Sequence, residues 1–102
     1  MSRQILTEVS ATVDADHEPE LVASFHELAA GPLPNGLLRT ELLRGQSQWR
    51  IQTLWRDRAA LDAMRAGSET PAAPRLFRNV GAEPSLQVYE IEGHHLVATA
   101  SE

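Results

Sequence analysis

The sequence predicts a single α+β domain with an antiparallel sheet, and three observations support this fold class. The chain has 102 residues, 42% of them hydrophobic and 23% charged, which is typical of one soluble globular domain. Four segments have the alternation and β-branched or aromatic content of strands. Segments with apolar residues at helical spacing separate them, so the predicted order is strand, helix, strand, strand, helix, short helix, strand.

The first predicted strand covers residues 4–13 and has a side-chain period of two. One of its faces carries Ile5, Thr7, Val9, Ala11 and Val13. A helix is expected to follow, because Asp14 and Asp16 are favourable capping residues and Pro19 suits a first turn. The apolar stripe of this helix is formed by Leu21, Phe25 and Leu28. Gly31, which precedes a proline, is expected to end it.

Residues 37–44 and 48–55 are predicted to be two strands of a hairpin, with the turn at residues 45–47. Strict alternation in the first strand separates Leu37 and Leu43 from Leu38 and Leu42. In the second strand, the residues that share a face are Trp49, Ile51, Thr53 and Trp55.

The second half of the chain predicts two helices and a last strand. Asp57 is expected to cap a helix that ends near Gly67, and Thr70-Pro71 is expected to start a shorter helix that ends at Gly81. Their apolar residues are Ala60, Leu61, Met64, Leu76, Phe77 and Val80. Residues 85–91 form the last predicted strand.

This order of elements is that of the ferredoxin-like βαββαβ fold, in which helices cover one face of an antiparallel sheet. We expect the domain to cover residues 1–93 and residues 94–102 to form a C-terminal tail. Both faces of the predicted sheet carry apolar residues, so the face without helices needs a partner. A second copy of the same sheet is the simplest partner, and we therefore predict a homodimer.

Composition and charge exclude several classes of function. The chain has no cysteine, so disulfides, thiolate metal ligands and a cysteine nucleophile are ruled out. A net charge of −5 argues against a nucleic-acid partner. Eight of the nine arginines fall within residues 31–82, where they could attract an anionic small molecule or pair with acids elsewhere. No membrane span or signal-peptide pattern is found, and a cytoplasmic location is expected.

Motif searches give no metal site and no nucleotide site. His17-Glu18 and His26-Glu27 begin like the zinc motif H-E-x-x-H, but the second histidine is missing in both cases. The adjacent pair His94 and His95 would point to opposite sides of an extended chain, which makes chelation of one ion difficult. The nucleophile elbow, the P-loop and the dinucleotide fingerprint are also missing.

Two tryptophans on one strand face are the strongest candidates for a binding site. The indoles could line an apolar cleft for a flat ligand, or they could be ordinary core residues. Opposite them we place Leu61, Met64 and Phe77. His26, at the edge of an apolar helix stripe, could act as a general base or could be an interfacial histidine. Arg75 could supply a cation to a phenolate in the cleft, or it could be solvated.

The segment from Trp55 to Met64, Trp-Arg-Asp-Arg-Ala-Ala-Leu-Asp-Ala-Met, resembles the antibiotic biosynthesis monooxygenase family. The general likeness extends over residues 4–91. The resemblance implies a dimeric α/β barrel built from two ferredoxin-like sheets packed face to face. It also implies oxidation of polycyclic phenols or anthrones to quinones without a metal or flavin, while related proteins degrade haem.

The site residues of the family are matched only in part by this sequence. Trp55 matches the strand-end tryptophan of the family, and Arg75 lies about where an anthrone-oxidising member has a pocket arginine. Ile51 and Leu61 replace the asparagine and tyrosine that bind substrate there. The haem-degrading branch requires a helix histidine, and residues 68–75 contain none, so we expect no haem degradation.

The sequence features and the family resemblance together predict a cofactor-independent monooxygenase that oxidises an aromatic or quinol-type small molecule with O₂. The expected roles are a base for His26, a cation beside the developing charge for Arg75, and no metal or other cofactor. The residues expected to bind substrate are Trp49, Trp55, Leu61, Met64 and Phe77. The alternatives are a non-catalytic barrel that binds a hydrophobic ligand and an accessory protein whose cleft is filled by its own side chains.

Overall fold

The structure is a computed structural model that describes residues 3–67, 71–95 and 97. Its elements are β1 (Ile5–Ala11), a 3-10 turn η1 (Ala15–His17), α1 (Glu18–Ala30), β2 (Leu37–Arg44), β3 (Trp49–Trp55), α2 (Arg58–Ala66), α3 (Ala72–Asn79) and β4 (Ser85–Glu90). The strands form one antiparallel sheet in the order β2-β3-β1-β4. The predicted ferredoxin-like α+β fold is confirmed.

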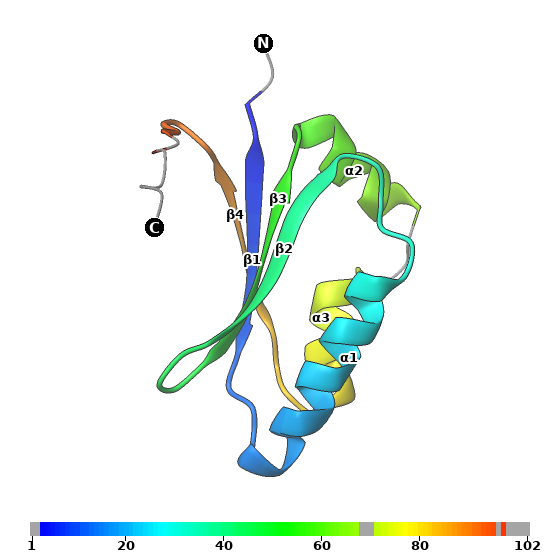
Figure 1. The fold of residues 1–102 in the computed structure, drawn as a ribbon, viewed down its shortest axis with the longest axis vertical. Helices are drawn as coiled ribbons and strands as arrows, with labels where there is room; N and C mark the ends of the chain where they lie inside the picture. The colour runs from blue at the N-terminus through cyan, green and yellow to red at the C-terminus, as the bar shows by residue number, and fades with distance from the viewer. Residues whose placement is uncertain (1–2, 68–70, 96, 98–102) are drawn as a thin grey trace, which may run out of the picture.

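The three α-helices lie together on one side of the sheet (Figure 1). In β1 and β3 every second residue is buried, so the sequence period of two places the same faces against the helices as predicted. On β3 these inward residues are Trp49, Ile51, Thr53 and Trp55. None of the helices in the described part of the chain is long and apolar enough to cross a membrane.

The expected alternation along β2 is wrong at its start. A register irregularity between Leu37 and Arg39 places Leu37 opposite Trp55, while Leu42 lies opposite Ile51. Leu37 and Leu42 therefore both pack against core residues, although strict alternation separates them. Leu38 is 50% exposed at the irregularity, because one extra residue shifts the phase of the side chains.

Helix starts agree with the prediction at α2 and in part at α1, where Pro19 lies in the first turn as predicted. The Asp57 carboxylate accepts a hydrogen bond from the Ala60 N–H at 2.9 Å and caps α2, as predicted. At α1, Asp14 precedes the 3-10 turn, and His17 occupies the N-cap without a side-chain hydrogen bond to the described helix. The helix α3 begins after Pro71, and Thr70 lies outside the described residues.

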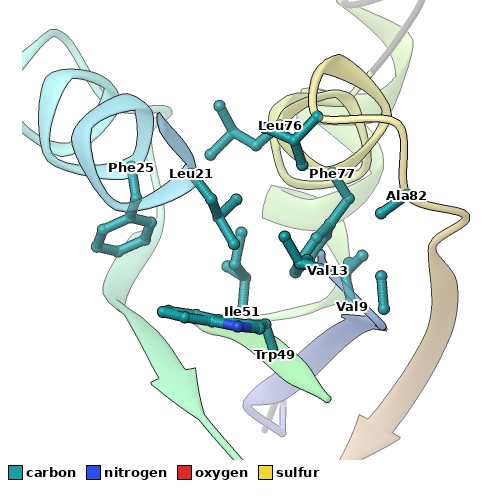
Figure 2. Packing of buried hydrophobic residues seen from close by; sticks show 11 residues of the cluster. Val9, Val13, Leu21, Phe25, Trp49, Ile51, Leu76, Phe77 and Ala82 are labelled. Atoms are coloured by element: carbon teal, nitrogen blue, oxygen red, sulfur yellow. The ribbon is translucent and has the colours of Figure 1, made fainter. Parts of the chain in front are cut away.

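The buried residues form two clusters between the sheet and the helices. The larger cluster joins β1 and β3 to α1 and α3, and Figure 2 shows Leu21, Ile51 and Trp49 lying close together within it. The smaller cluster consists of Ile5, Trp55, Ala60 and Leu61, near the start of α2. The cavity described next lies between the sheet and the helices and includes residues of both clusters.

Candidate ligand-binding cavity

A cavity of about 120 Å³ lies between the inner face of the sheet and the helices. Its lining comes from β1, β2, β3 and β4, the end of α1 and the loop after it, α2, and the start of α3. Leu33 and Leu86 line it and are 43% and 47% exposed, so the cavity reaches the surface. Most of the lining is apolar, which is typical of sites for small organic molecules.

Three threonines form a row along the sheet side of the cavity. Thr7, Thr53 and Thr40 are register partners on the adjacent strands β1, β3 and β2. All three line the cavity, and Thr7 and Thr53 are only 8% and 7% exposed. The hydroxyls of Thr40 and Thr53 lie 3.0 Å apart and share a hydrogen bond. We call these three residues the threonine row.

Trp55 is the aromatic residue of the described lining. Its side chain is buried, and its indole N–H donates a hydrogen bond to the Thr7 hydroxyl at 3.1 Å. This bond satisfies the indole donor and fixes the ring beside the threonine row. Leu61 and Met64 of α2 line the cavity together with Trp55. The structure therefore brings these three of the predicted substrate-binding residues together at one cavity.

Arg65 is the one charged residue among the described residues that line the cavity. It belongs to the last turn of α2 and is half-buried. A guanidinium beside an apolar cavity can stabilise a phenolate or another anionic oxygen. Arg65 is not among the residues predicted for the site, because the phase of α2 against the sheet is not apparent from local spacing.

Trp49 and Phe77 are core residues rather than part of the cavity lining. Phe77 is fully buried in the larger cluster. The Trp49 indole N–H donates to the Glu18 carboxylate at 3.0 Å, and the Arg44 guanidinium lies 4.3 Å from the Trp49 ring centroid. Arg44 also donates to Glu18 at 3.1 Å. These two hydrogen bonds, first that from Trp49, lower the pKa of the Glu18 carboxyl.

The expected catalytic pair, His26 and Arg75, is not brought to the cavity. Both residues are exposed, and neither is among the described residues that line it. The cause is helix phase: His26 follows the buried Phe25, with their rings 6.0 Å apart, and Arg75 precedes the buried Leu76. A neighbour in sequence is turned about 100° around the helix, which here means toward solvent.

Two of the three positions of the threonine row are recognisable in the sequence. Thr7 and Thr53 occupy inward positions in strands whose other inward residues are mainly apolar. A polar residue at such a position needs a buried partner or borders a cavity. Thr40 gave no comparable signal, because leucines occupy both faces of β2 and the alternation alone does not show which face is inward. Within the described residues, no group of three or more His, Asp or Glu side chains could hold a metal ion.

Solved structures share this fold at low sequence identity. They include the cofactor-independent oxygenase SnoaB from Streptomyces nogalater (an N63A variant), with a TM-score of 0.67, 16% identity, and coverage of 91% of this chain and 97% of that one. A Deinococcus radiodurans protein provisionally assigned as an antibiotic biosynthesis monooxygenase has a TM-score of 0.63 and 13% identity. That match covers 95% of this chain and 99% of that one. The heme-degrading protein of Mycobacterium tuberculosis has a TM-score of 0.61 and 24% identity, and the match covers 93% of this chain and 99% of that one.

The chain has the fold of the antibiotic biosynthesis monooxygenases. Identities of 13–24% establish a shared fold and leave the reaction to be argued from the site. No protein-family model and no curated protein sequence matches the chain.

Proposed function

We propose that the protein is a cofactor-independent monooxygenase that oxidises a small aromatic or quinol-type molecule in the cavity. The observation that carries the proposal is the composition of the lining: Trp55 and aliphatic residues surround a space that Arg65 reaches. A cofactor-independent oxygenase of the same fold supports it.

The proposed reaction needs an electron-rich anion, and the cavity provides conditions for one. A phenolate or enolate transfers an electron to O₂ more readily than its neutral form. The Arg65 guanidinium would stabilise the anionic oxygen and so lower the pKa of the substrate hydroxyl. The apolar walls exclude water, which strengthens this interaction.

The atoms balance for a phenol that is converted to a quinone. The substrate anion gives one electron to O₂, and the resulting superoxide combines with the substrate radical at a ring carbon. The peroxide anion takes up a proton from solvent and then loses water together with the hydrogen of that ring carbon, so that one oxygen atom stays on the ring as a carbonyl and the other leaves as water. Among the described lining residues there is no His, Asp, Glu or Tyr, so the first proton passes to solvent at the open end.

Oxygen uptake by metal-free protein tests the proposal against a panel of anthrones, naphthols and hydroquinones. We expect uptake that persists with chelators and falls about tenfold or more in Arg65→Gln. Arg78→Gln is the control, because Arg78 is exposed on α3 and outside the described lining. A loss in Arg75→Gln, with Arg65→Gln unaffected, would instead support the role that the family resemblance implies for Arg75.

A second function, ligand binding without catalysis, is favoured by one specific observation. The described lining contains no group that titrates near neutral pH and could take the substrate proton. Under this alternative the same aromatic molecules bind beside Trp55 but consume no oxygen. Quenching of tryptophan fluorescence without oxygen uptake above the uncatalysed rate would be the result that favours it.

A further inference from the structure

We propose that the threonine row is a hydrogen-bonding subsite that selects a single-ring aromatic molecule carrying a hydroxyl or carbonyl oxygen. This inference rests on the proposed function only in requiring that the cavity binds a small molecule. It does not require that the molecule is oxidised.

The threonine row has one hydroxyl hydrogen more than its internal hydrogen bonds use. The Thr7 hydroxyl accepts from the Trp55 indole and donates to the Thr53 carbonyl oxygen at 3.5 Å, a long hydrogen bond. Thr40 and Thr53 share one hydrogen bond, which uses one of their two hydroxyl hydrogens. The hydroxyl that accepts in this pair therefore keeps a hydrogen for a further partner.

The Thr40–Thr53 pair lies at the cavity. Both residues line it, and Thr53 is only 7% exposed. In an otherwise mainly apolar lining, a hydroxyl that can both donate and accept is a directional contact for a ligand oxygen. Either a phenolic hydroxyl or a quinone carbonyl satisfies it, so substrate and product can use the same contact.

The size of the cavity limits the ligand. Its volume of about 120 Å³ is close to the roughly 150 Å³ of a protein cavity that binds benzene, and it opens to the surface at Leu33 and Leu86, so one aromatic ring can enter with a substituent at the open end. Leu61 and Met64 provide apolar contacts for the ring next to the row. A monocyclic phenol or quinone therefore matches both the volume and the hydrogen-bonding group, whereas a polycyclic molecule would extend through the open end.

The test compares p-cresol with p-xylene, which have the same shape and differ in one hydroxyl. Binding is followed by NMR through the Trp55 indole N–H and the methyl groups of Leu61 and Thr7. In the wild-type protein we expect p-cresol to bind about threefold to tenfold more tightly, the value of one net hydrogen bond.

The double variant Thr40→Val/Thr53→Val removes both hydroxyls of the pair and keeps the side-chain shape. Because both partners go together, neither is left without its hydrogen-bonding partner, and folding is checked from the same spectra. We expect the preference for p-cresol to disappear. Thr12→Val is the control, because Thr12 is exposed, bonded to the Ser47 carbonyl and outside the described lining.

The outcomes separate this inference from the proposed function. Equal binding of the two molecules by the wild-type protein, or a preference that survives in the double variant, overturns the inference and leaves cavity binding intact. No shift at Trp55 with either molecule overturns both. A preference that depends on the threonine pair supports the inference even where no oxygen is consumed.

Discussion

Trp49 and Trp55 lie at opposite ends of one strand face and have different surroundings. Trp49 is held by Glu18 and Arg44 in the core, whereas Trp55 is held by Thr7 and borders the cavity. In both cases the partner of the indole N–H comes from another element, α1 for Trp49 and β1 for Trp55. The difference between a core tryptophan and a site tryptophan therefore lies in their tertiary contacts.

At the residue scale, the Glu18 carboxylate predicts a pH dependence of stability. Its pKa is lower in the folded chain than its ordinary value of about 4.5, because Trp49 and Arg44 donate hydrogen bonds to it. The ionised carboxylate therefore contributes stability above pH 4.5, and this contribution is lost as the pH falls through the folded pKa.

Chemical unfolding from pH 7 to pH 3 checks this expectation. We expect Glu18→Gln to lower the free energy of unfolding at pH 7 and to approach the wild-type value at low pH. Glu20→Gln is the matched control, since Glu20 is also in the first turn of α1 but is exposed. The same pH dependence in both variants would show that helix-terminal charge, rather than the contacts of Glu18, is responsible.

At the scale of elements, the connection between α1 and β2 depends on Gly36. Its φ is +84°, and a Cβ at this position would lie 2.4 Å from the Ala60 Cβ of α2. Its carbonyl also accepts a hydrogen bond from the Arg56 N–H at 2.7 Å. The close approach packs the start of β2 against α2 beside the cavity lining.

We expect Gly36→Ala to destabilise the protein, with about 1–2 kcal/mol from the left-handed backbone alone and more from the contact with Ala60. Thermal and urea unfolding measure the effect. Gly93→Ala is the control, because nothing lies within 4 Å of a Cβ built there. A melting temperature of Gly36→Ala within a degree of wild type would contradict this role of Gly36.

At the scale of the whole molecule, the sheet has an outer face that the described helices leave open (Figure 1). Leu54, Leu6 and Tyr89 are register partners on β3, β1 and β4 and form an apolar row on this face. Beside it, Glu8 pairs with Arg50 at 3.1 Å and accepts from Gln52 at 2.9 Å. An apolar row next to a polar network suits a self-complementary contact, so we propose that two copies pair through this face.

Light scattering at tens of micromolar protein measures the assembly directly. We expect a dimer for the wild-type chain and a monomer for Leu54→Asp, because a carboxylate would be buried without a partner in the paired sheets. Ala23→Asp, at an exposed position of α1, is expected to stay dimeric. A wild-type monomer would contradict the proposal.

The sequence by itself determined the order of the elements, the inward faces of β1 and β3, and the cap of α2. Each depends on local rules: the period of two in a strand, the period of 3.6 in a helix, and the hydrogen bond of a capping side chain. Trp55, Leu61 and Met64 face the cavity for the same reason, since each lies on the apolar face of its own element.

Only the tertiary structure decided which residues meet at the cavity. His26 and Arg75 face solvent, whereas Arg65 lines the cavity. The rotation of each helix relative to the sheet decides this, and the periodicity within a helix does not specify that rotation. Thr40 joins the threonine row because the register of β2 against β3 places it opposite Thr53. A site built from several elements depends on their relative rotation and register, and packing sets both.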